Sequence, residues 1–498
     1  MEDFFKKHKI ILSIFTLVFL TFVIITACSY RGAFFDSLGH FFAFIDDILA
    51  GKDVNYVFLH DYRTRHFSNF LSIIPFNLAI FAGVSDLKLM LKIFTGSFYF
   101  MNFVFLITGY LVAKRTKRYD IAVWLFVFYC FFLVPGSVWF TRECRIAIIL
   151  QFILLMYFLS KEKLSKRDIV PVSLLVVYMF ESFETTFLYG IMLFVFALIY
   201  YKKNPEAQNI KAKILIGIGS LISSIYIFFM TKHWASMQES NIQVSNFFHL
   251  FIDQTLNTFS HFFRSSLIIT AIGLGVASCI LFVRREFKTK DFCFLIPLVS
   301  LILLLLYQNT RLVPAPYLES EFYTLPLLLS IPALGILILF DYKNWTIAKY
   351  NKNVYSNLIV LSSIIGILHF GWQINSSFYA YEYVSYLQNV LKNAKKTIVK
   401  LPEEAKYKDF YVYDSCFGSM QRSVLFSPEY KVKSIMFPGK TNRDYGSTCY
   451  DNIAYTYYLE DEDELSLQYS VSLEVKNQYW DMTKIAKKFK QKGLVKDE

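Results

Sequence analysis

The segment FSNFLSIIPFNLAIFAG, residues 67–83, decides the topology of the chain. It is apolar enough to cross a membrane, yet it carries Asn69, Pro75 and Asn77. If it does not cross, about 19 lysines and arginines lie in loops on the side of the N-terminal Lys6, against about five on the other side. If it crosses, this bias reverses. The positive-inside rule therefore predicts that residues 67–83 form a helix on the outer membrane surface.

The composition is that of a membrane protein. The 498 residues are 55% hydrophobic and 19% aromatic, and the mean hydropathy is +0.40. The net charge of +12 arises from basic clusters between apolar runs, so it indicates topology and not a nucleic-acid partner. These clusters lie at 114–118, 161–167, 202–203, 284–290 and 343–352. The seven cysteines form no pattern with metal-ligand spacing, which argues against a structural zinc site.

Apolar stretches of spanning length recur along most of the chain. They lie at 10–28, 93–113, 119–135, 145–160, 168–201, 212–230, 265–283, 292–307, 322–340 and 354–371. The stretch 168–201 is long enough for two short crossings, so we expect an α-helical polytopic membrane protein with about eleven transmembrane helices. The first run is longer than the core of a cleaved signal peptide, which favours a retained helix.

Two domains are expected. Residues 1–371 form a transmembrane domain that includes an external loop at 29–92, and residues 372–498 form a small extracytoplasmic α+β domain. The N-terminus is then cytoplasmic and the C-terminus extracytoplasmic, in a multi-pass protein of the cytoplasmic (inner) cell membrane.

The expected external domain has alternating polar and apolar segments. Segments 409–415, 430–437 and 465–475 predict strands, and 482–491 predicts a basic helix. Its cysteines are Cys416 and Cys449, which an oxidising location allows to pair as a disulfide. Two free buried thiols are the alternative.

Ionisable side chains crowd the external loop 29–92, among them Asp36, His40, Arg63, Arg65 and His66. A carboxylate such as Asp36, in a confined site at the membrane surface, can act as a general base towards an acceptor hydroxyl. The alternative is a solvated or helix-capping acid. The histidines either contact a substrate or satisfy the backbone of the loop.

A second external loop contributes Arg142, Glu143 and Arg145. The two arginines are three residues apart at a helix start and share one face, where guanidinium groups can hold a phosphate and stabilise the charge of a leaving group. The alternative is that Arg142 and Arg145 are interfacial anchors, whose side chains reach towards lipid headgroups.

The turn inside 168–201 carries Glu181 and Glu184. Because 34 residues barely suffice for two crossings, this turn cannot stand far above the bilayer, and acids near membrane depth are functional candidates. Arg311 lies in an expected external loop in the second half of the chain. There it either contacts a ligand or is a charge at the rim of the site without a role in binding.

The order of these features resembles the GT-C superfamily of membrane glycosyltransferases, which includes protein mannosyltransferases and aminoarabinose transferases that use polyprenyl-phosphate sugars. The resemblance rests on FFDSLGHFFAF (34–44), DDILAGKD (46–53), the segment 65–92 and VPGSVWFTRECR (134–145). It covers about the first 165 residues. It implies that Asp36 is the catalytic base of an inverting transfer and that Arg142, Glu143, Arg145 and Arg311 contact the donor.

The resemblance implies transfer of a sugar from a polyprenyl-phosphate donor to a glycan, lipid or protein acceptor of the cell envelope, on the external face. Membrane lipids are the other expected partners. The sequence identifies no cofactor. A divalent metal is an open alternative without support from the sequence, and Ser37, where the family has a second acid, argues against metal use. The alternatives are an O-antigen polymerase or ligase, a transporter or flippase, and a non-catalytic scaffold.

Overall fold

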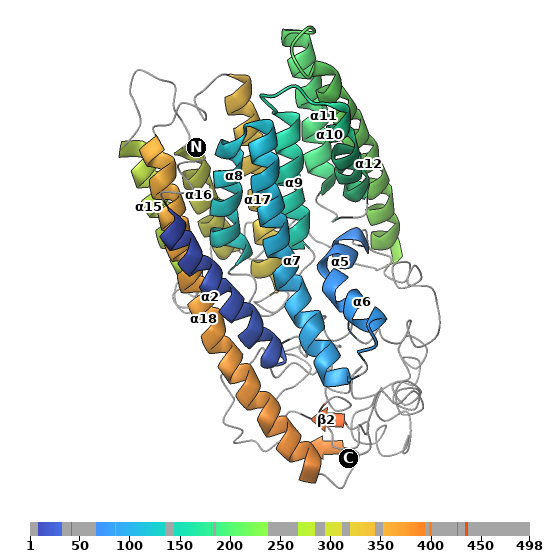
Figure 1. Cartoon of the computed structure of the whole chain (residues 1–498), viewed down its shortest axis with the longest axis vertical. Coiled ribbons are helices and arrows are strands. Elements are labelled where there is room, and N and C mark those ends of the chain that lie inside the picture. The colour runs from blue at the N-terminus through green and yellow to red at the C-terminus, as the bar shows by residue number, and fades with distance from the viewer. Residues whose placement is uncertain are drawn as a thin grey trace.

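The computed structural model describes a set of segments that spans most of the apolar part of the chain (Figure 1). The described residues are 8–31, 41, 66–84, 86–134, 144–180, 182, 186–237, 267–283, 294–310, 319–343, 352–393, 398–400, 426 and 434–436.

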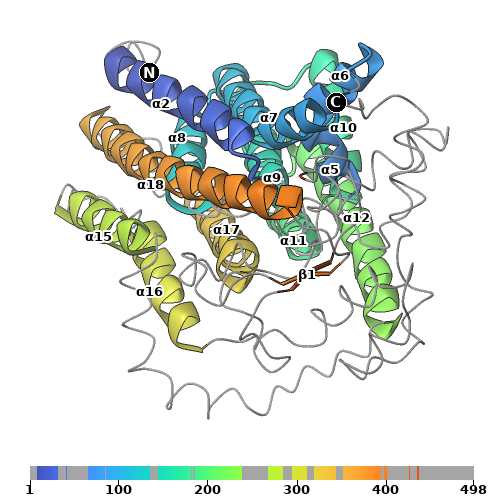
Figure 2. The ribbon, with the colours of Figure 1, turned by 90° about the horizontal axis from the view of Figure 1, so that it is seen from below.

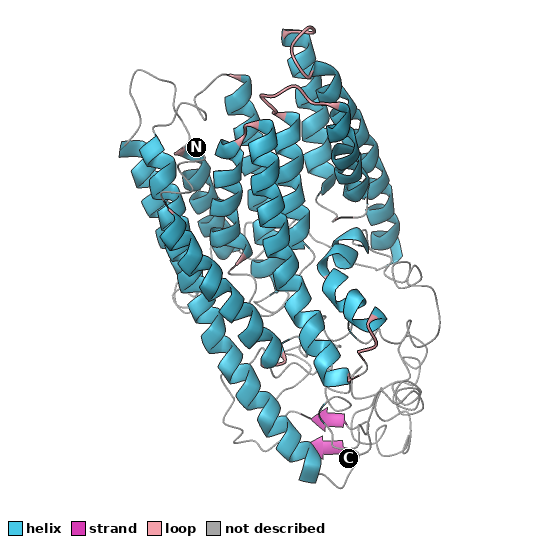
Figure 3. Ribbon diagram, viewed as in Figure 1, coloured by secondary structure: helices cyan, strands magenta, loops and turns pink. Residues whose placement is uncertain are grey.

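Long helices dominate this part of the chain (Figure 3). They are α2 (Lys9–Cys28), α7 (Leu87–Thr116), α8 (Tyr119–Phe128), α9 (Cys144–Phe158), α10 (Lys166–Phe180), α11 (Thr186–Lys203), α12 (Ile210–Met237), α15 (Leu267–Val283), α16 (Leu295–Thr310), α17 (Glu319–Tyr342) and α18 (Lys352–Asn393). Each predicted apolar run coincides with one of these helices, and the run 168–201 is divided between α10 and α11.

Among the described residues, α2, α7, α11, α12 and α18 contain stretches long and apolar enough to cross a membrane. Shorter apolar helices of 10–17 residues pack between them, in α8, α9, α15 and α17. The chain is thus a helical membrane protein, and the number of crossings stays a prediction.

The segment 67–83 forms two short helices instead of one long one, α5 (His66–Ser72) and α6 (Ile74–Phe81). The break falls at Ile73, and Pro75 occupies the first turn of α6, where its missing N–H leaves no helical hydrogen bond unmade. Neither helix approaches the roughly 20 residues that a crossing needs. Both pack on α7, on the half of that helix that begins at Leu87 (Figure 1).

Aromatic side chains fill the centre of the bundle. The ring of Phe22 on α2 lies 5.0 Å from that of Tyr99 on α7 and 5.1 Å from that of Phe370 on α18. Phe19 stacks on Phe103 at 5.0 Å. These contacts hold α2 side by side with α18 and α7, as both views of the bundle show (Figures 1 and 2).

The helix α8 continues as a π-helical turn, η2 (Tyr129–Leu133). The hydroxyl of Thr270 on α15 donates to the carbonyl of Phe131 at 2.8 Å, and the same hydroxyl lies 3.2 Å from His369 Nε2 on α18. A π turn leaves carbonyls without their usual partner, and Thr270 satisfies one of them.

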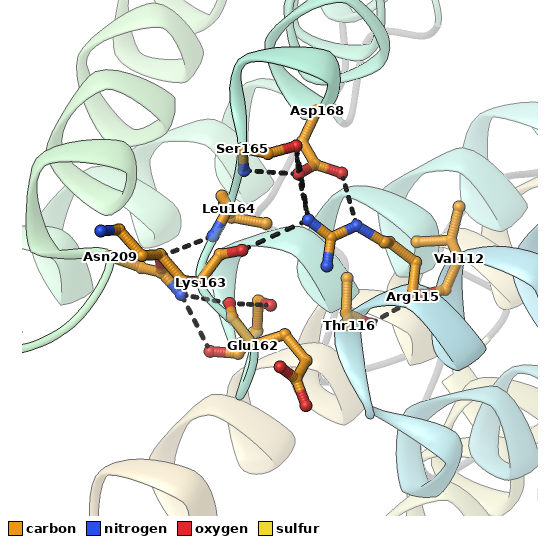
Figure 4. Close-up of polar contacts among 10 residues, drawn as sticks. Val112, Arg115, Thr116, Glu162, Lys163, Leu164, Ser165, Asp168 and Asn209 are labelled. Atoms are coloured by element: carbon orange, nitrogen blue, oxygen red, sulfur yellow. Dashed lines mark hydrogen bonds and ion pairs between the residues drawn. The ribbon is translucent and has the colours of Figure 1, made fainter.

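One end of the bundle is held together by polar contacts between its loops (Figure 4). Arg115, at the end of α7, donates to both oxygens of Asp168 at 3.0 and 2.6 Å. The hydroxyl and backbone N–H of Ser165 also donate to Asp168, which forms a capping interaction at the start of α10. Asn209 bonds to the backbone of Glu162 at 2.7 Å and so brings in the start of α12.

A buried ion-pair cluster lies at the same end. Arg118, in the turn between α7 and α8, binds both oxygens of Asp120 and contacts Asp341 of α17 at 2.6 Å. Tyr200 of α11 donates to Asp341 at 2.7 Å. Burial alone would lower the pKa of Arg118, but the two carboxylates raise it above its ordinary value, so Arg118 is charged near neutral pH.

These contacts place the basic loops 114–118 and 161–167 at one end of the bundle, which we name the basic end. Arg118 also donates to the carbonyl of Leu159, Lys203 donates to the carbonyl of Tyr342, and His8 bonds to Ser356. The start of α2, the end of α11 and the start of α18 therefore lie at the basic end too. We name the opposite end, towards which α5 and α6 lie, the outer end, after the orientation that the positive-inside rule predicts.

The helix α18 continues without a break from Lys352 to Asn393. Its 42 residues measure about 63 Å, roughly twice the hydrocarbon thickness of a membrane. Position 371–372, the expected domain boundary, therefore lies inside a continuous helix. Beyond α18, the strands β1 (Ile398–Lys400) and β2 (Ser434–Met436) pair in parallel. β2 falls within the predicted strand 430–437, whereas 409–415, 465–475 and 482–491 lie outside the described residues.

Candidate functional site

Most of the residues expected to carry chemistry lie outside the described part of the chain. These are Asp36, His40, Arg63, Arg65, Arg142, Glu143, Glu181, Glu184 and Arg311, together with Cys416 and Cys449. His66 is the first residue of α5, although its side chain is not described. Arg145 is described in full.

Arg145 points into the bundle. It lies in the first turn of α9, only 2% of it is exposed, and its guanidinium carbon is 5.5 Å from the ring centroid of Tyr99 on α7. Arg145 therefore lies inside the protein and not on its exposed surface, while its role as a phosphate ligand or a headgroup anchor stays a prediction. Its positive charge, the π face of Tyr99 and the N-terminus of α9 lie close together at the outer end of the bundle.

Two buried amides lie on the same two helices as the pair of Arg145 and Tyr99. Asn102 follows Tyr99 by one turn of α7, and Gln151 lies between one and two turns beyond Arg145 on α9. Their exposed fractions are 2% and 4%, and within the described residues neither Asn102 Oδ1 nor Gln151 Oε1 has a hydrogen-bond partner. A buried acceptor without a donor costs about 1–3 kcal/mol, so both oxygens are suited to a hydroxyl donor.

The start of α11 lies beside the middle of α9. Thr186, the first residue of α11, bonds to Gln151 Nε2 at 3.3 Å and to the Ser182 hydroxyl at 2.9 Å. Tyr189 donates to the carbonyl of Gln151 at 2.7 Å. Gln151 is the eighth of the 15 residues of α9, so the residues that flank Glu181 and Glu184 lie at the mid-height of that helix. The depth of Glu181 and Glu184 relative to the membrane stays a prediction.

The helix α5 packs beside this turn. The ring of Phe67 lies 6.5 Å from that of Tyr178 near the end of α10, and α5 also contacts α9. The segment that begins at His66 therefore meets the same region of α9 as the 182–186 turn. We name the group formed by Tyr99, Asn102, Arg145, Gln151, Ser182 and Thr186 the outer polar layer.

A second buried arginine at the outer end was not among the predicted residues. Arg31 follows α2 directly, and only 4% of it is exposed. Its Nη1 donates to the carbonyl of Gln373 at 3.1 Å and to the hydroxyl of Ser377 at 3.1 Å, both on α18. The available signal was its position, because a cation directly after a spanning run must either reach headgroups or be held by the protein.

The outer polar layer combines groups that suit a phosphorylated sugar. A guanidinium binds phosphate through charge-assisted hydrogen bonds, and amide oxygens accept hydrogen bonds from sugar hydroxyls. Among the described residues, no three His, Cys, Asp or Glu side chains are grouped so as to hold a metal ion.

Comparison of the chain with protein-family models, curated proteins and solved structures finds no match.

Proposed function

We propose that the chain is an integral-membrane glycosyltransferase that takes a sugar from a polyprenyl-phosphate donor on the outer face of the membrane and passes it to an acceptor of the cell envelope. The observation that carries the proposal is the burial of Arg145 in the first turn of α9, with its guanidinium 5.5 Å from the ring centroid of Tyr99 on α7. A guanidinium binds phosphate through charge-assisted hydrogen bonds, so an arginine held at this position supports a contact with the donor phosphate.

In this proposal Arg145 holds the donor phosphate and stabilises the charge that develops on it as the bond to C1 of the sugar breaks. Asp36 accepts the proton of the acceptor hydroxyl as that oxygen attacks C1 from the opposite face. One displacement inverts the configuration at C1, and the polyprenyl phosphate leaves. The membrane itself confines both the donor lipid and the protein to one surface, which raises the local concentration of donor.

The test is sugar transfer in proteoliposomes. Wild-type protein is mixed with a polyprenyl-phosphate sugar that carries a radioactive label, together with an envelope extract as acceptor. We expect label in the acceptor fraction, no transfer by Asp36→Asn, and loss of at least tenfold in rate for Arg145→Gln. The exposed Lys211, at the basic end, provides the control Lys211→Gln, which should transfer at the wild-type rate.

Two results would contradict the proposal. Full transfer by Asp36→Asn would remove the assigned base. Movement of intact donor lipid across the bilayer, without transfer of its sugar, would identify a flippase instead.

A further inference from the structure

Gln373 of α18 contacts both chain segments that lead out of the bundle towards the two external loops. Its backbone carbonyl accepts from Arg31 Nη1 at 3.1 Å, and its Oε1 accepts from the same nitrogen at 3.4 Å. Its Nε2 donates to the carbonyl of Val134 at 2.8 Å. Arg31 precedes the loop that carries Asp36, and Val134 precedes the loop that carries Arg142. One side chain therefore joins the starting points of both loops.

The hydrogen bonds around Gln373 form an ordered set. The hydroxyl of Ser377 donates to the Gln373 carbonyl at 3.0 Å and accepts from Arg31 Nη1 at 3.1 Å. The single hydroxyl hydrogen of Ser377 is donated to the Gln373 carbonyl. In the 3.4 Å contact between the hydroxyls of Thr26 and Ser377, Thr26 is therefore the donor. Arg31, Gln373 and Ser377 are all buried, so the charge of Arg31 is held among the dipoles of α18.

The position of Gln373 suits this task. It lies 21 residues after Lys352, the start of α18 at the basic end, which is about 31 Å along the helix axis. That distance equals roughly one hydrocarbon thickness, so Gln373 lies at the outer edge of the membrane. The helix α18 is continuous through this point and packs along α2 and against η2, which makes it a rigid support.

We propose that Gln373 is a positioning residue, which rests on the proposed transferase function: it fixes the start of the Asp36 loop relative to the start of the Arg142 loop. The acceptor hydroxyl, the base and the donor phosphate must meet within a fraction of an ångström, and a displacement of about 1 Å can reduce the rate about 100-fold. Gln373 touches no substrate in this account and acts through Arg31 and Val134.

Hydrogen exchange measured by mass spectrometry in lipid nanodiscs tests the connection without any substrate. The amides of Ser29 and Tyr30 bond to carbonyls within α2, and the amide of Val134 bonds to Tyr129. In Gln373→Met both side-chain bonds are lost, so exchange should rise on the order of tenfold in peptides covering 25–31 and 129–134. Gln373→Glu keeps the acceptor for Arg31 but loses the donor to Val134, so exchange should rise in 129–134 alone. Ser376→Ala, on the same helix, should exchange as the wild type does.

Transfer kinetics test the positioning role. Gln373→Met should lower kcat tenfold or more with KM for the donor unchanged, because Arg145 still binds the phosphate. Wild-type kcat in a Gln373→Met protein that folds overturns the positioning role, and unchanged exchange in both peptides overturns the connection itself. Absence of transfer by the wild-type protein overturns the proposed function and the positioning role with it, while the exchange result still decides whether Gln373 joins the two loop starts.

Discussion

The guanidinium of Arg145 lies 5.5 Å from the ring centroid of Tyr99, in a pair that joins the first turn of α9 to α7. Only 2% of Arg145 and 3% of Tyr99 are exposed. An aromatic face stabilises a desolvated guanidinium by about 2 kcal/mol, less than the several kcal/mol that burial of an ion costs. The pair therefore places a buried cation beside an aromatic face at the start of α9.

The contribution of the Tyr99 ring can be separated from that of its hydroxyl. Tyr99→Phe and Tyr99→Leu both lack the hydroxyl, and they differ in the aromatic face that lies over Arg145. We expect Tyr99→Leu to be less stable than Tyr99→Phe by about 1–2 kcal/mol, measured by SDS-induced unfolding in detergent micelles. Equal stabilities of the two variants would show that the ring does not stabilise the cation.

The ion pairs at the basic end should differ sharply in strength. The side chain of Arg118 is 1% exposed and that of Arg115 is 40% exposed. Arg118→Leu leaves the buried Asp120 without its partner and should cost about 3–5 kcal/mol of unfolding free energy. Arg115→Leu should cost less, because Arg115 is 40% exposed and the buried Asp168 keeps two hydrogen bonds from Ser165. The same unfolding assay compares them, and similar losses for the two variants would contradict the burial assigned to Arg118.

The helices α11 and α12 approach so closely that a side chain at Gly190 would overlap Ser224 and the carbonyl of Ser220. Gly190→Val should therefore separate the two helices and cost about 1–3 kcal/mol of stability. Gly275 on α15 is the matched control, because a Cβ there would meet nothing within 4 Å. Gly275→Ala should match or exceed the wild type by up to about 1 kcal/mol. A Gly190→Val protein as stable as the wild type would contradict the close approach.

The orientation in the membrane can be tested with single cysteines in a variant that lacks the seven native ones. Ala82, after α6, and Lys117, after α7, are both exposed and lie towards opposite ends of the bundle. We expect a membrane-impermeant maleimide to label Ala82→Cys in intact cells and Lys117→Cys only in opened cells. The reverse pattern would invert the proposed topology.

The apolar runs predicted the positions of the long helices because a crossing requires about 20 apolar residues with every backbone group bonded internally. The π turn at 129–133 has no local signal in the sequence, and Thr270, which bonds to its Phe131 carbonyl, lies 139 residues away. The continuation of α18 did have a signal. Ala380, Tyr383, Val384, Leu387 and Leu391 follow helical spacing and are buried, although this stretch was assigned to the start of a separate domain.

The candidate site likewise combines features that the sequence predicts with contacts that it does not reveal. The shortness of 168–201 predicts a turn near membrane depth, which stays a prediction, and the contact of Thr186 with Gln151 places the start of α11 beside the middle of α9. The amides Asn102 and Gln151 were overlooked, although a polar residue inside a spanning segment is itself a functional signal. The contact between Arg31 and Gln373 could not be found from one sequence, because 342 residues separate the two.

The most direct test of the central claim is the affinity of the protein for a polyprenyl phosphate, measured by thermophoresis in nanodiscs for the wild type, Arg145→Gln and Lys211→Gln. The account predicts that Arg145→Gln binds about 10- to 100-fold more weakly than the wild type, which corresponds to the loss of about 1.5–3 kcal/mol from a hydrogen bond to a charged group. Lys211→Gln should bind as the wild type does. Equal affinity of Arg145→Gln and the wild type would contradict the assignment of a phosphate site to Arg145.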